Sequence, residues 1–154
     1  NYPEWLEPYL RESLGGDFEA GMRALEEQAP TDLRVNTLKT TREELLRNLK
    51  AEGFEVSATE LTPTCIRLAR RMPIFTSKYF KLGHFEVQDE GSQMVAQIVD
   101  VKPGQRVIDF CAGAGGKTLS IAADMKNRGR ILAWDTSEKR LGQIRERLRR
   151  AGVD

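Results

Sequence analysis

The run from Asp109 to Thr118, Asp-Phe-Cys-Ala-Gly-Ala-Gly-Gly-Lys-Thr, constrains the fold of this chain more than any other segment. The apolar stretch at 106–110 predicts a buried strand before it, and the sequence at 119–125 predicts a helix after it. Small residues at such a junction let the backbone approach a ligand, and the first helical turn leaves N–H donors unpaired. The segment therefore predicts an α/β unit whose loop holds part of a nucleotide.

Three classes of nucleotide loop fit this segment to different degrees. A phosphate-binding loop needs Gly, four residues and then Gly-Lys-Ser/Thr, but Cys111 stands where its first glycine belongs. A dinucleotide loop needs G-x-G-x-x-G, but Thr118 stands where its third glycine belongs. The third class is the first motif of S-adenosylmethionine-dependent methyltransferases, in which an acidic residue ends the strand and small residues lead into the helix. Asp109, Gly113 and Gly115 fit that pattern, with Cys111 in place of its first glycine.

Asp135 favours the methyltransferase pattern. It ends a predicted strand at 131–134 and lies 20 residues beyond Gly115. A carboxylate about 20 residues past nucleotide-binding glycines can accept hydrogen bonds from both hydroxyls of a ribose. The alternative is that Asp135 only caps the helix expected at 138–150, although Thr136 or Ser137 could cap that helix equally well. We therefore predict that Asp135 binds a ribose.

The composition excludes several other classes of protein. The 154 residues suffice for one ordinary domain or two small ones. No stretch approaches 18 apolar residues and no basic-then-apolar leader opens the chain, so we expect neither a membrane span nor a secretion signal. Cys65, Cys111 and the single histidine, His84, predict no metal site and no disulfide framework. A reducing, cytoplasmic setting is expected.

The net charge of +1 hides an uneven distribution. Residues 1–30 hold seven acidic side chains and two arginines, whereas the rest of the chain holds 22 basic and 16 acidic residues. One basic cluster is interleaved with Phe75, Tyr79 and Phe80, a composition that suits single-stranded RNA, with its phosphates and stackable bases. A solvated surface over buried aromatic rings remains an equal alternative. The candidate RNA-binding residues of this cluster are Arg67, Arg70, Arg71, Lys78 and Lys81.

The helix expected at 138–150 carries the second basic cluster. Leu141, Ile144 and Leu148 form an apolar stripe at helical spacing along it. We therefore expect its arginines to lie on the opposite, solvated face.

Glycine and proline residues, which interrupt helices and strands, divide the chain into three predicted regions. Two helices, at 3–14 and 17–28, are separated by Gly15-Gly16, with Asp17 as a cap. A small open α+β sandwich follows, in which a capping box at 41–44 starts a helix with Leu45, Leu46 and Leu49 inward that ends at Gly53. Its strands are expected at 33–36, 54–56, 65–68 and 85–87. A helix from about 92 to 99 then leads to the nucleotide-binding strand.

Three segments make the chain resemble RNA cytosine-5 methyltransferases of the Sun (Fmu, nucleolar protein) family, which form 5-methylcytosine in ribosomal and transfer RNA. Residues 33–37, Leu-Arg-Val-Asn-Thr, are similar to the family's amino-terminal motif. Residues 87–93, Val-Gln-Asp-Glu-Gly-Ser-Gln, resemble the joint between its RNA-binding and catalytic domains. Residues 109–118 resemble its cofactor loop, with Gly113-Ala114 where Ala-Pro is commoner. The match runs, with gaps, from about residue 30 to the end.

This resemblance implies an α/β chain with three parts. Residues 1–30 would be a helical extension, and residues 31–87 an RNA-recognition-like α+β domain. Residues 88–154 would be the amino-terminal part of a Rossmann-like methyltransferase domain, truncated after its first two strands. The partner would be RNA, with rRNA favoured over tRNA, and the cofactor S-adenosylmethionine. The implied cofactor-binding residues are Cys111, Ala112, Gly113, Ala114, Gly115, Gly116, Lys117 and Asp135.

The resemblance also implies which catalytic groups this chain lacks. In the family a cysteine thiolate attacks C6 of cytosine and C5 accepts the methyl group, which requires an activated thiolate near the base. One family cysteine follows Asp-Ala-Pro and the other lies in Thr-Cys-Ser, and neither motif occurs here. Cys111 would lie against the cofactor, Cys65 is expected to be a buried strand residue, and His84 is isolated. We therefore predict no catalytic residue in this chain.

Two other functions fit the sequence. One is a non-catalytic RNA-binding module built on residues 31–87, and the other is a phosphate-loop nucleotide-binding protein. A sheet with two of about seven strands would also leave Ile108, Ile131 and Leu132 uncovered, which predicts marginal stability or self-association through the uncompleted sheet.

Overall fold

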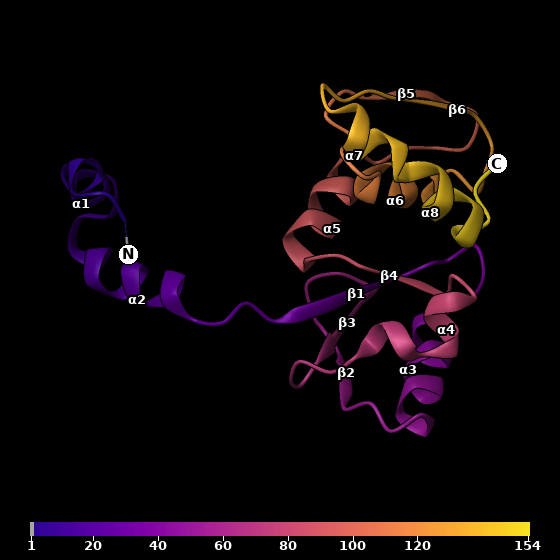
Figure 1. The fold of residues 1–154 in the computed structure, drawn as a ribbon, viewed down its shortest axis with the longest axis horizontal. Coiled ribbons are helices and arrows are strands. Elements are labelled where there is room, and N and C mark those ends of the chain that lie inside the picture. Colours follow the sequence, from indigo (N-terminus) through magenta and orange to yellow (C-terminus); the bar gives the residue numbers. More distant parts are fainter. Residues whose placement is uncertain (1) are drawn as a thin grey trace.

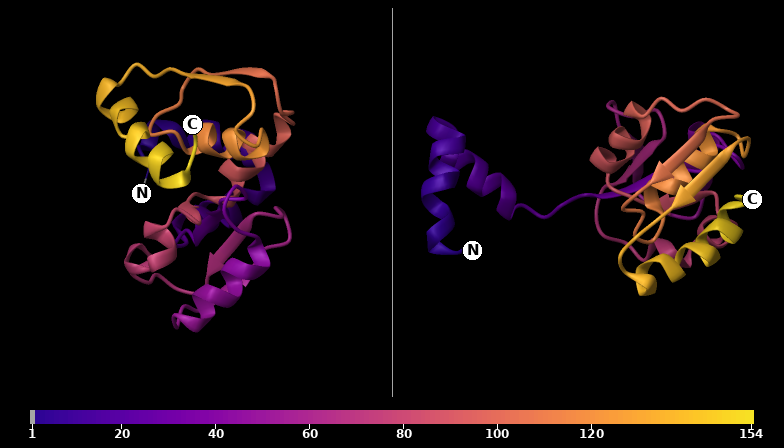
Figure 2. Two further views of the ribbon diagram at one scale, coloured as in Figure 1. Left: turned by 90° about the vertical axis from the view of Figure 1, so that its right-hand side faces the viewer. Right: turned by 90° about the horizontal axis from the view of Figure 1, so that it is seen from above.

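The computed structural model describes residues 2–154, so Asn1 of the predicted helical extension lies outside the described part. The extension forms a 3₁₀ turn at Glu4–Leu6, helix α1 (Glu7–Leu14), a second turn at Gly15–Asp17 and helix α2 (Phe18–Glu26). An extended segment carries this helical pair away from the rest of the chain (Figure 1 and the right-hand view of Figure 2). The break at the two glycines is confirmed, but the predicted cap is wrong, because the Asp17 side chain accepts no capping hydrogen bond.

An antiparallel sheet of four strands follows, in the order β2-β3-β1-β4. Its strands are β1 (Thr31–Val35), β2 (Val56–Ala58), β3 (Cys65–Leu68) and β4 (Phe85–Val87). Helix α3 (Arg42–Ala51) connects β1 to β2, and helix α4 (Lys78–Lys81) precedes β4, which gives the β-α-β-β-α-β order of a ferredoxin-like domain. The core beneath the sheet contains fully buried side chains of Leu33, Leu45, Leu49, Ile66 and Phe85. The predicted α+β sandwich is confirmed.

The ends of α3 show how local sequence sets the boundaries of this domain. The Thr41 hydroxyl accepts a hydrogen bond from the Glu44 N–H at 3.2 Å, but the Glu44 carboxylate accepts from the Thr40 hydroxyl, so only half of the capping box forms. At the other end, Gly53 has a φ of +87° and the Phe54 N–H donates to the Leu49 carbonyl. Because Phe54 closes the helix in this way, β2 begins two residues later than expected.

The second sheet has two parallel strands, β5 (Arg106–Asp109) and β6 (Arg130–Ala133). Helix α6 (Gly116–Asp124) connects them, and a small core joins its Ile121 to Val107 and Ile131 of the strands. Helix α5 (Glu90–Ile98) contacts both α6 and β1, so it bridges the two sheets. It begins earlier than expected because the Asp89 carboxylate caps it by accepting from the Ser92 N–H. The expected helix at 138–150 is divided into α7 (Glu138–Gly142) and α8 (Ile144–Ala151).

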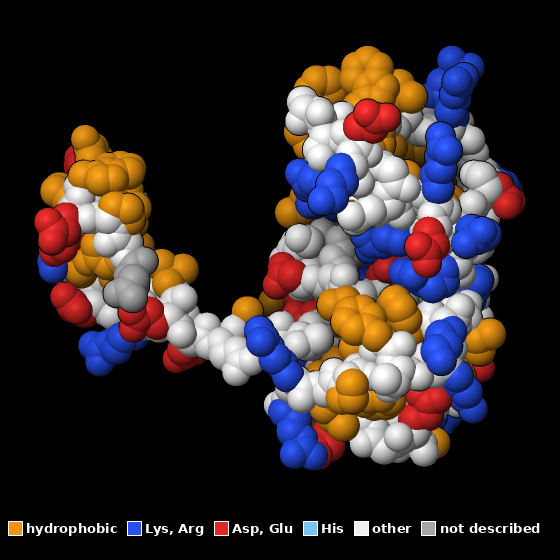
Figure 3. All heavy atoms as spheres, in the orientation of Figure 1, with side chains coloured by type: hydrophobic (Ala, Val, Ile, Leu, Met, Phe, Trp, Pro, Cys, Tyr) orange, Lys and Arg blue, Asp and Glu red, His pale blue; other side chains and the backbone are white. Residues whose placement is uncertain are grey.

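The outer face of the two-stranded sheet is exposed. Hydrophobic side chains gather over β5 and β6 at the top of Figure 3. Ile108 is 63% exposed and Leu132 is 40% exposed, because alternate residues of each strand point away from α6. The expectation of a buried strand at 106–110 is therefore wrong for this face. The expectation of uncovered Ile108 and Leu132 is confirmed, whereas Ile131 packs on the α6 side.

Helix α8 docks on the ferredoxin-like domain through buried polar contacts. The Asn36 amide donates to the carbonyls of Gly83 and Ala151, both at 2.8 Å. Arg147 and Arg150 pair with Glu86, a β4 residue whose side chain is 5% exposed. The expectation that the arginines of this helix stay in solvent is thus wrong for these two, because a buried carboxylate draws them to the sheet. None of the helices in residues 2–154 is long and apolar enough to cross a membrane.

Replacing Gly83 with alanine tests this docking. Gly83 has a φ of +74°, and a Cβ there would lie 1.9 Å from the Arg150 carbonyl oxygen. Gly53 is the matched control, because its φ is also positive but a Cβ would meet nothing within 4 Å. We expect Gly53→Ala to lower the free energy of unfolding by about 1 kcal/mol, the cost of a left-handed alanine, and Gly83→Ala by about 3 kcal/mol. Equal losses in denaturant titrations would show that α8 does not depend on Gly83.

Candidate cofactor site

The loop between β5 and α6 requires glycine at two positions. Gly113 has a φ of +54° and Gly115 a φ of +84°, both in the left-handed region that other residues adopt at a cost. Gly115 is the N-cap of α6, and a Cβ there would lie 2.4 Å from the Ile144 side chain of α8. The loop can therefore lie close to α8 only because Gly115 has no side chain, and a Cβ at Gly113 would meet the Arg140 side chain of α7.

Asp135 joins this loop to the end of β6. One carboxylate oxygen accepts from the Gly113 N–H at 2.7 Å and the other accepts from the Ser137 N–H at 2.8 Å. The bond from Ser137, and then that from Gly113, lowers the pKa of Asp135, so the carboxylate is ionised at neutral pH. Ser137, not Asp135, caps α7 by accepting from the Arg140 N–H. The alternative that Asp135 only caps this helix is therefore not supported.

A cavity of about 390 Å³ opens beside Asp135 at the carboxyl ends of β5 and β6. Open α/β sheets bind ligands at this end of their strands. The rings of Phe110 and Trp134 lie 5.8 Å apart at their centroids, and each ring is more than half exposed. The cavity is lined by Phe110, Cys111, Trp134, Asp135, Thr136, Arg140 and Leu141. It combines flat apolar surfaces with one carboxylate and one guanidinium.

Two hydrogen bonds oppose a phosphate-binding role for the loop. The Gly113 N–H, which a phosphate would need, donates to the Asp135 carboxylate. The Thr118 hydroxyl, which would bind a magnesium ion in a phosphate loop, donates to Asp109 at 2.7 Å. An anionic ligand at this position would also meet the negative charge of Asp135.

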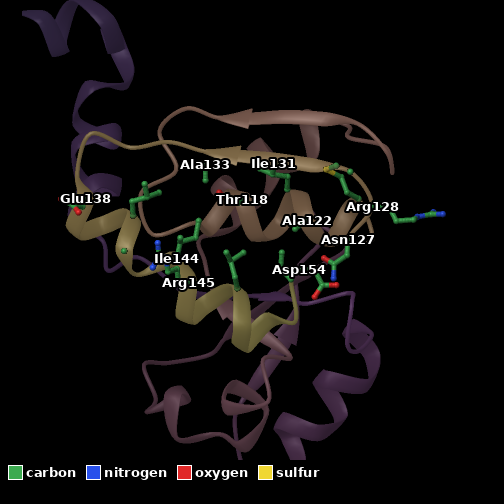
Figure 4. A pocket seen from close by; sticks show the side chains of 16 residues that line it. Thr118, Ala122, Asn127, Arg128, Ile131, Ala133, Glu138, Ile144, Arg145 and Asp154 are labelled. Carbon is green, nitrogen blue, oxygen red and sulfur yellow. The ribbon is translucent and has the colours of Figure 1, made fainter.

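A larger cavity of about 680 Å³ lies between α6, β6 and the α7–α8 pair (Figure 4). Its walls include Ala122, Ile131, Ile144 and Leu148, so much of it is apolar. None of the predicted cofactor residues 111–117 and Asp135 lines it. The predicted site residues instead belong to the smaller cavity, through Cys111 and Asp135, and to the loop behind it.

Comparison with known proteins identifies the family. The chain matches the model "Methyltr_RsmF/B-like, ferredoxin-like domain" over residues 2–75 and the model "16S rRNA methyltransferase RsmB/F" over residues 96–154. It is 35% identical over 153 residues to ribosomal RNA small subunit methyltransferase B of Pseudomonas syringae pv. tomato. The chain belongs to the RsmB/F, or Sun, family. The alignment covers 99% of this chain and 34% of that relative, so the chain spans about a third of the relative's length.

Further similar proteins support this family assignment. A mouse 28S rRNA (cytosine-C(5))-methyltransferase is 34% identical over 144 residues, which cover 82% of this chain and 31% of the mouse protein. The structure of a methyltransferase homologue from Pyrococcus horikoshii is 31% identical, with a TM-score of 0.91 over 100% of this chain and 51% of that one. NSun6 from the same organism, solved with SFG, has a TM-score of 0.87 at 22% identity over 99% of this chain and 63% of that one, which supports the fold alone.

The predicted RNA-binding residues of this family member have different environments. Arg67 forms two hydrogen bonds with the buried Asp32, at 2.7 and 2.9 Å, and one with Glu90, so it is tied to the protein interior. The bond to Asp32 raises the pKa of Arg67. Arg70 pairs with Glu55 at 2.7 Å on the surface. Exposed basic side chains remain at Arg71, Lys78 and Lys81.

The aromatic residues of the same cluster also divide. Phe75 is 58% exposed, whereas Tyr79 and Phe80 pack against the core of the ferredoxin-like domain. The alternative of aromatic rings in the core therefore holds for Tyr79 and Phe80. Phe75 is the ring of this cluster that remains available to a base.

Sequence reasoning missed the residues that flank the glycine loop at 111–117. Phe110 and Trp134 each follow a parallel strand, and that position was a usable signal. Arg34 and Arg147 were not predicted to touch the loop, because their contacts join segments 82 and 33 residues apart.

The two cysteines should react at very different rates. Cys111 is exposed, whereas Cys65 is buried in β3 and burial raises the pKa of its thiol. We expect iodoacetamide to modify Cys111 in the folded protein and to reach Cys65 only in urea, as measured by mass spectrometry. The Cys111→Ser variant should take up no label without denaturant. Equal rates at the two thiols would contradict the burial of Cys65.

Proposed function

We propose that this chain binds S-adenosylmethionine and RNA for the methylation of C5 of cytosine. The substrate that we favour is rRNA over tRNA. The observation that carries the proposal is Asp135, an ionised carboxylate that fixes the glycine loop and lines a cavity between two aromatic rings. Three parts of the chain would contribute to this function. They are a helical extension at 1–30, an RNA-recognition-like domain at 31–87 and the first part of a Rossmann-like methyltransferase domain at 88–154. Family membership supports the reaction, because relatives are named rRNA methyltransferases.

The chemistry of the smaller cavity fits this cofactor. S-adenosylmethionine carries no phosphate, so it does not compete with the hydrogen bonds that occupy the loop at Gly113 and Thr118. The Asp135 carboxylate retains lone pairs for ribose hydroxyls, because each oxygen accepts one hydrogen bond from the protein. Phe110 and Trp134 offer flat surfaces for the base. The cavity volume of about 390 Å³ is within the range of small-molecule sites.

The cofactor would supply the methyl group, and the chain's own residues would bind and orient it. Cys111 to Lys117 would form the loop side of the site. This chain contains neither Asp-Ala-Pro-Cys nor Thr-Cys-Ser, and Cys65 lies buried in β3. We therefore assign it cofactor and RNA binding and no nucleophile of its own.

Two further proposals follow from the exposed surfaces. Arg71, Lys78 and Lys81 would contact RNA phosphates beside Phe75. Ile108 and Leu132 are exposed apolar side chains through which the two-stranded sheet would associate with a second copy. A non-catalytic RNA-binding module and a phosphate-loop protein remain as outcomes of the tests below.

Cofactor binding is tested by calorimetry with S-adenosylmethionine. We expect Asp135→Ala to weaken binding about 10- to 100-fold, because it removes hydrogen bonds to a charged group worth about 1.5–3 kcal/mol. Asp154→Ala is the matched control, because Asp154 lines the larger cavity instead. Magnesium-dependent ATP binding without S-adenosylmethionine binding would favour the phosphate loop, and RNA binding alone would favour the non-catalytic module.

RNA binding is tested by the salt dependence of affinity. Changing Arg71, Lys78 and Lys81 together to glutamine should reduce the salt slope by about two to three and weaken binding to all RNA sequences. The matched control changes Arg106, Arg128 and Arg130, which are exposed at the amino-terminal ends of β5 and β6. Equal losses from the two triple variants in fluorescence anisotropy would contradict a specific basic surface.

A further inference from the structure

Two arginines donate hydrogen bonds to carbonyls of the cofactor loop that Asp135 does not contact. Arg147 of α8 donates from Nη1 to the Ala114 carbonyl at 2.7 Å. Arg34 of β1 donates from Nη1 to the Gly116 carbonyl at 2.5 Å. These carbonyls flank Gly115, the left-handed residue that starts α6. The two guanidinium groups therefore fix the peptide groups on both sides of the turn.

Both arginines are anchored in the ferredoxin-like sheet. Arg147 donates from Nε and Nη2 to one oxygen of Glu86 on β4, at 3.2 and 3.0 Å. Arg150 donates to the other oxygen of Glu86 at 2.6 Å. Arg34 belongs to β1 itself and also donates to the Gln88 side chain at 2.8 Å. The loop is thus connected to two neighbouring strands of the other domain.

The charges around these groups keep the arrangement intact at neutral pH. Burial lowers the pKa of Arg34 to about 10, with Glu86 opposing this shift and Arg147 adding to it. Arg34 is therefore still protonated at neutral pH and can donate to the Gly116 carbonyl. Glu86 accepts from two arginines in a site where its side chain is 5% exposed.

We propose that Arg34 and Arg147 are positioning residues of the cofactor loop, through which the ferredoxin-like domain fixes the geometry of the S-adenosylmethionine site. This inference rests on the proposed function. Asp135 binds the loop at the Gly113 N–H, and the arginines bind it at the Ala114 and Gly116 carbonyls, which Asp135 does not contact. Because binding free energies are reciprocal, cofactor binding then strengthens the docking of the two domains, and docking strengthens cofactor binding.

The first experiment measures the loop without any ligand. Hydrogen exchange in residues 112–118 is compared between the unaltered chain, Arg147→Met and Arg149→Met. Arg149 is the matched control, because it is exposed on the same helix. We expect exchange in the loop to rise about tenfold in Arg147→Met and to stay unchanged in Arg149→Met. Unchanged loop exchange in Arg147→Met would overturn the proposal.

The second experiment measures S-adenosylmethionine affinity by calorimetry. We expect a loss of about tenfold for Arg147→Met, within the usual range of coupling between sites, and none for Arg149→Met. Arg147→Lys should not restore affinity, because an ammonium cannot bind Glu86 and the Ala114 carbonyl with the same fork. Glu86→Gln should weaken binding less, and combining it with Arg147→Met should add little. Additive losses would mean that Glu86 does not act through Arg147.

The two experiments separate this inference from the proposed function. If the unaltered chain binds no S-adenosylmethionine, the proposed function fails for this chain, while loop exchange still decides whether Arg147 positions the loop. If the chain binds the cofactor and Arg147→Met binds it equally well, the coupling fails and the proposed function stands. A melting curve for each variant shows whether the change is local, and Glu86→Gln replaces Arg147→Met if the latter does not fold.

Discussion

The arrangement of the two sheets depends on the pairing of the buried Glu86 carboxylate with two arginines of α8. Glu86 accepts hydrogen bonds from Arg147 and Arg150 while its own side chain is 5% exposed. A carboxylate in such a position is costly unless it is paired, and removing one partner of a buried pair typically costs about 3–5 kcal/mol. Separating α8 from the ferredoxin-like domain therefore has a large cost in free energy. Since α8 also covers Gly115 with Ile144, the same contact determines how closely the loop is enclosed.

The three segments that first suggested the family meet at this interface. Asn36 of the amino-terminal motif donates to the last turn of α8, and Arg34 of the same motif donates to the loop. Gln88 of the joint segment accepts from Arg34 and lies near Gly116, where an added Cβ would be 3.5 Å from its amide. Segments that look like separate motifs in the sequence are thus parts of one packed contact.

Local patterns in the sequence predicted most of the elements, because helix caps, glycine turns and alternating apolar residues act over a few positions. They located the loop and Asp135 for the same reason, although the ribose contact of Asp135 stays a prediction. They failed where a distant partner decides the outcome. The apolar stripe of the single helix expected at 138–150 agrees with the burial of Ile144 on α8. It could not indicate that Glu86, about 60 residues earlier, draws two arginines out of solvent. Arg67 was likewise predicted to contact RNA, but it pairs with the buried carboxylates of Asp32 and Glu90.

The position of Arg147 suggests how RNA binding and cofactor binding would be coupled. A loop carbonyl bonded to Arg147 shares that arginine with Glu86 on β4, and β4 belongs to the domain proposed to hold RNA. Movement of β4 relative to α8 would have to stretch a charge-assisted bond or pull the Ala114 carbonyl with it. RNA that shifts this domain would therefore change the loop through one guanidinium group. Direct contact between RNA and cofactor is not required for that coupling, since the ion pair already spans the distance between the two sheets.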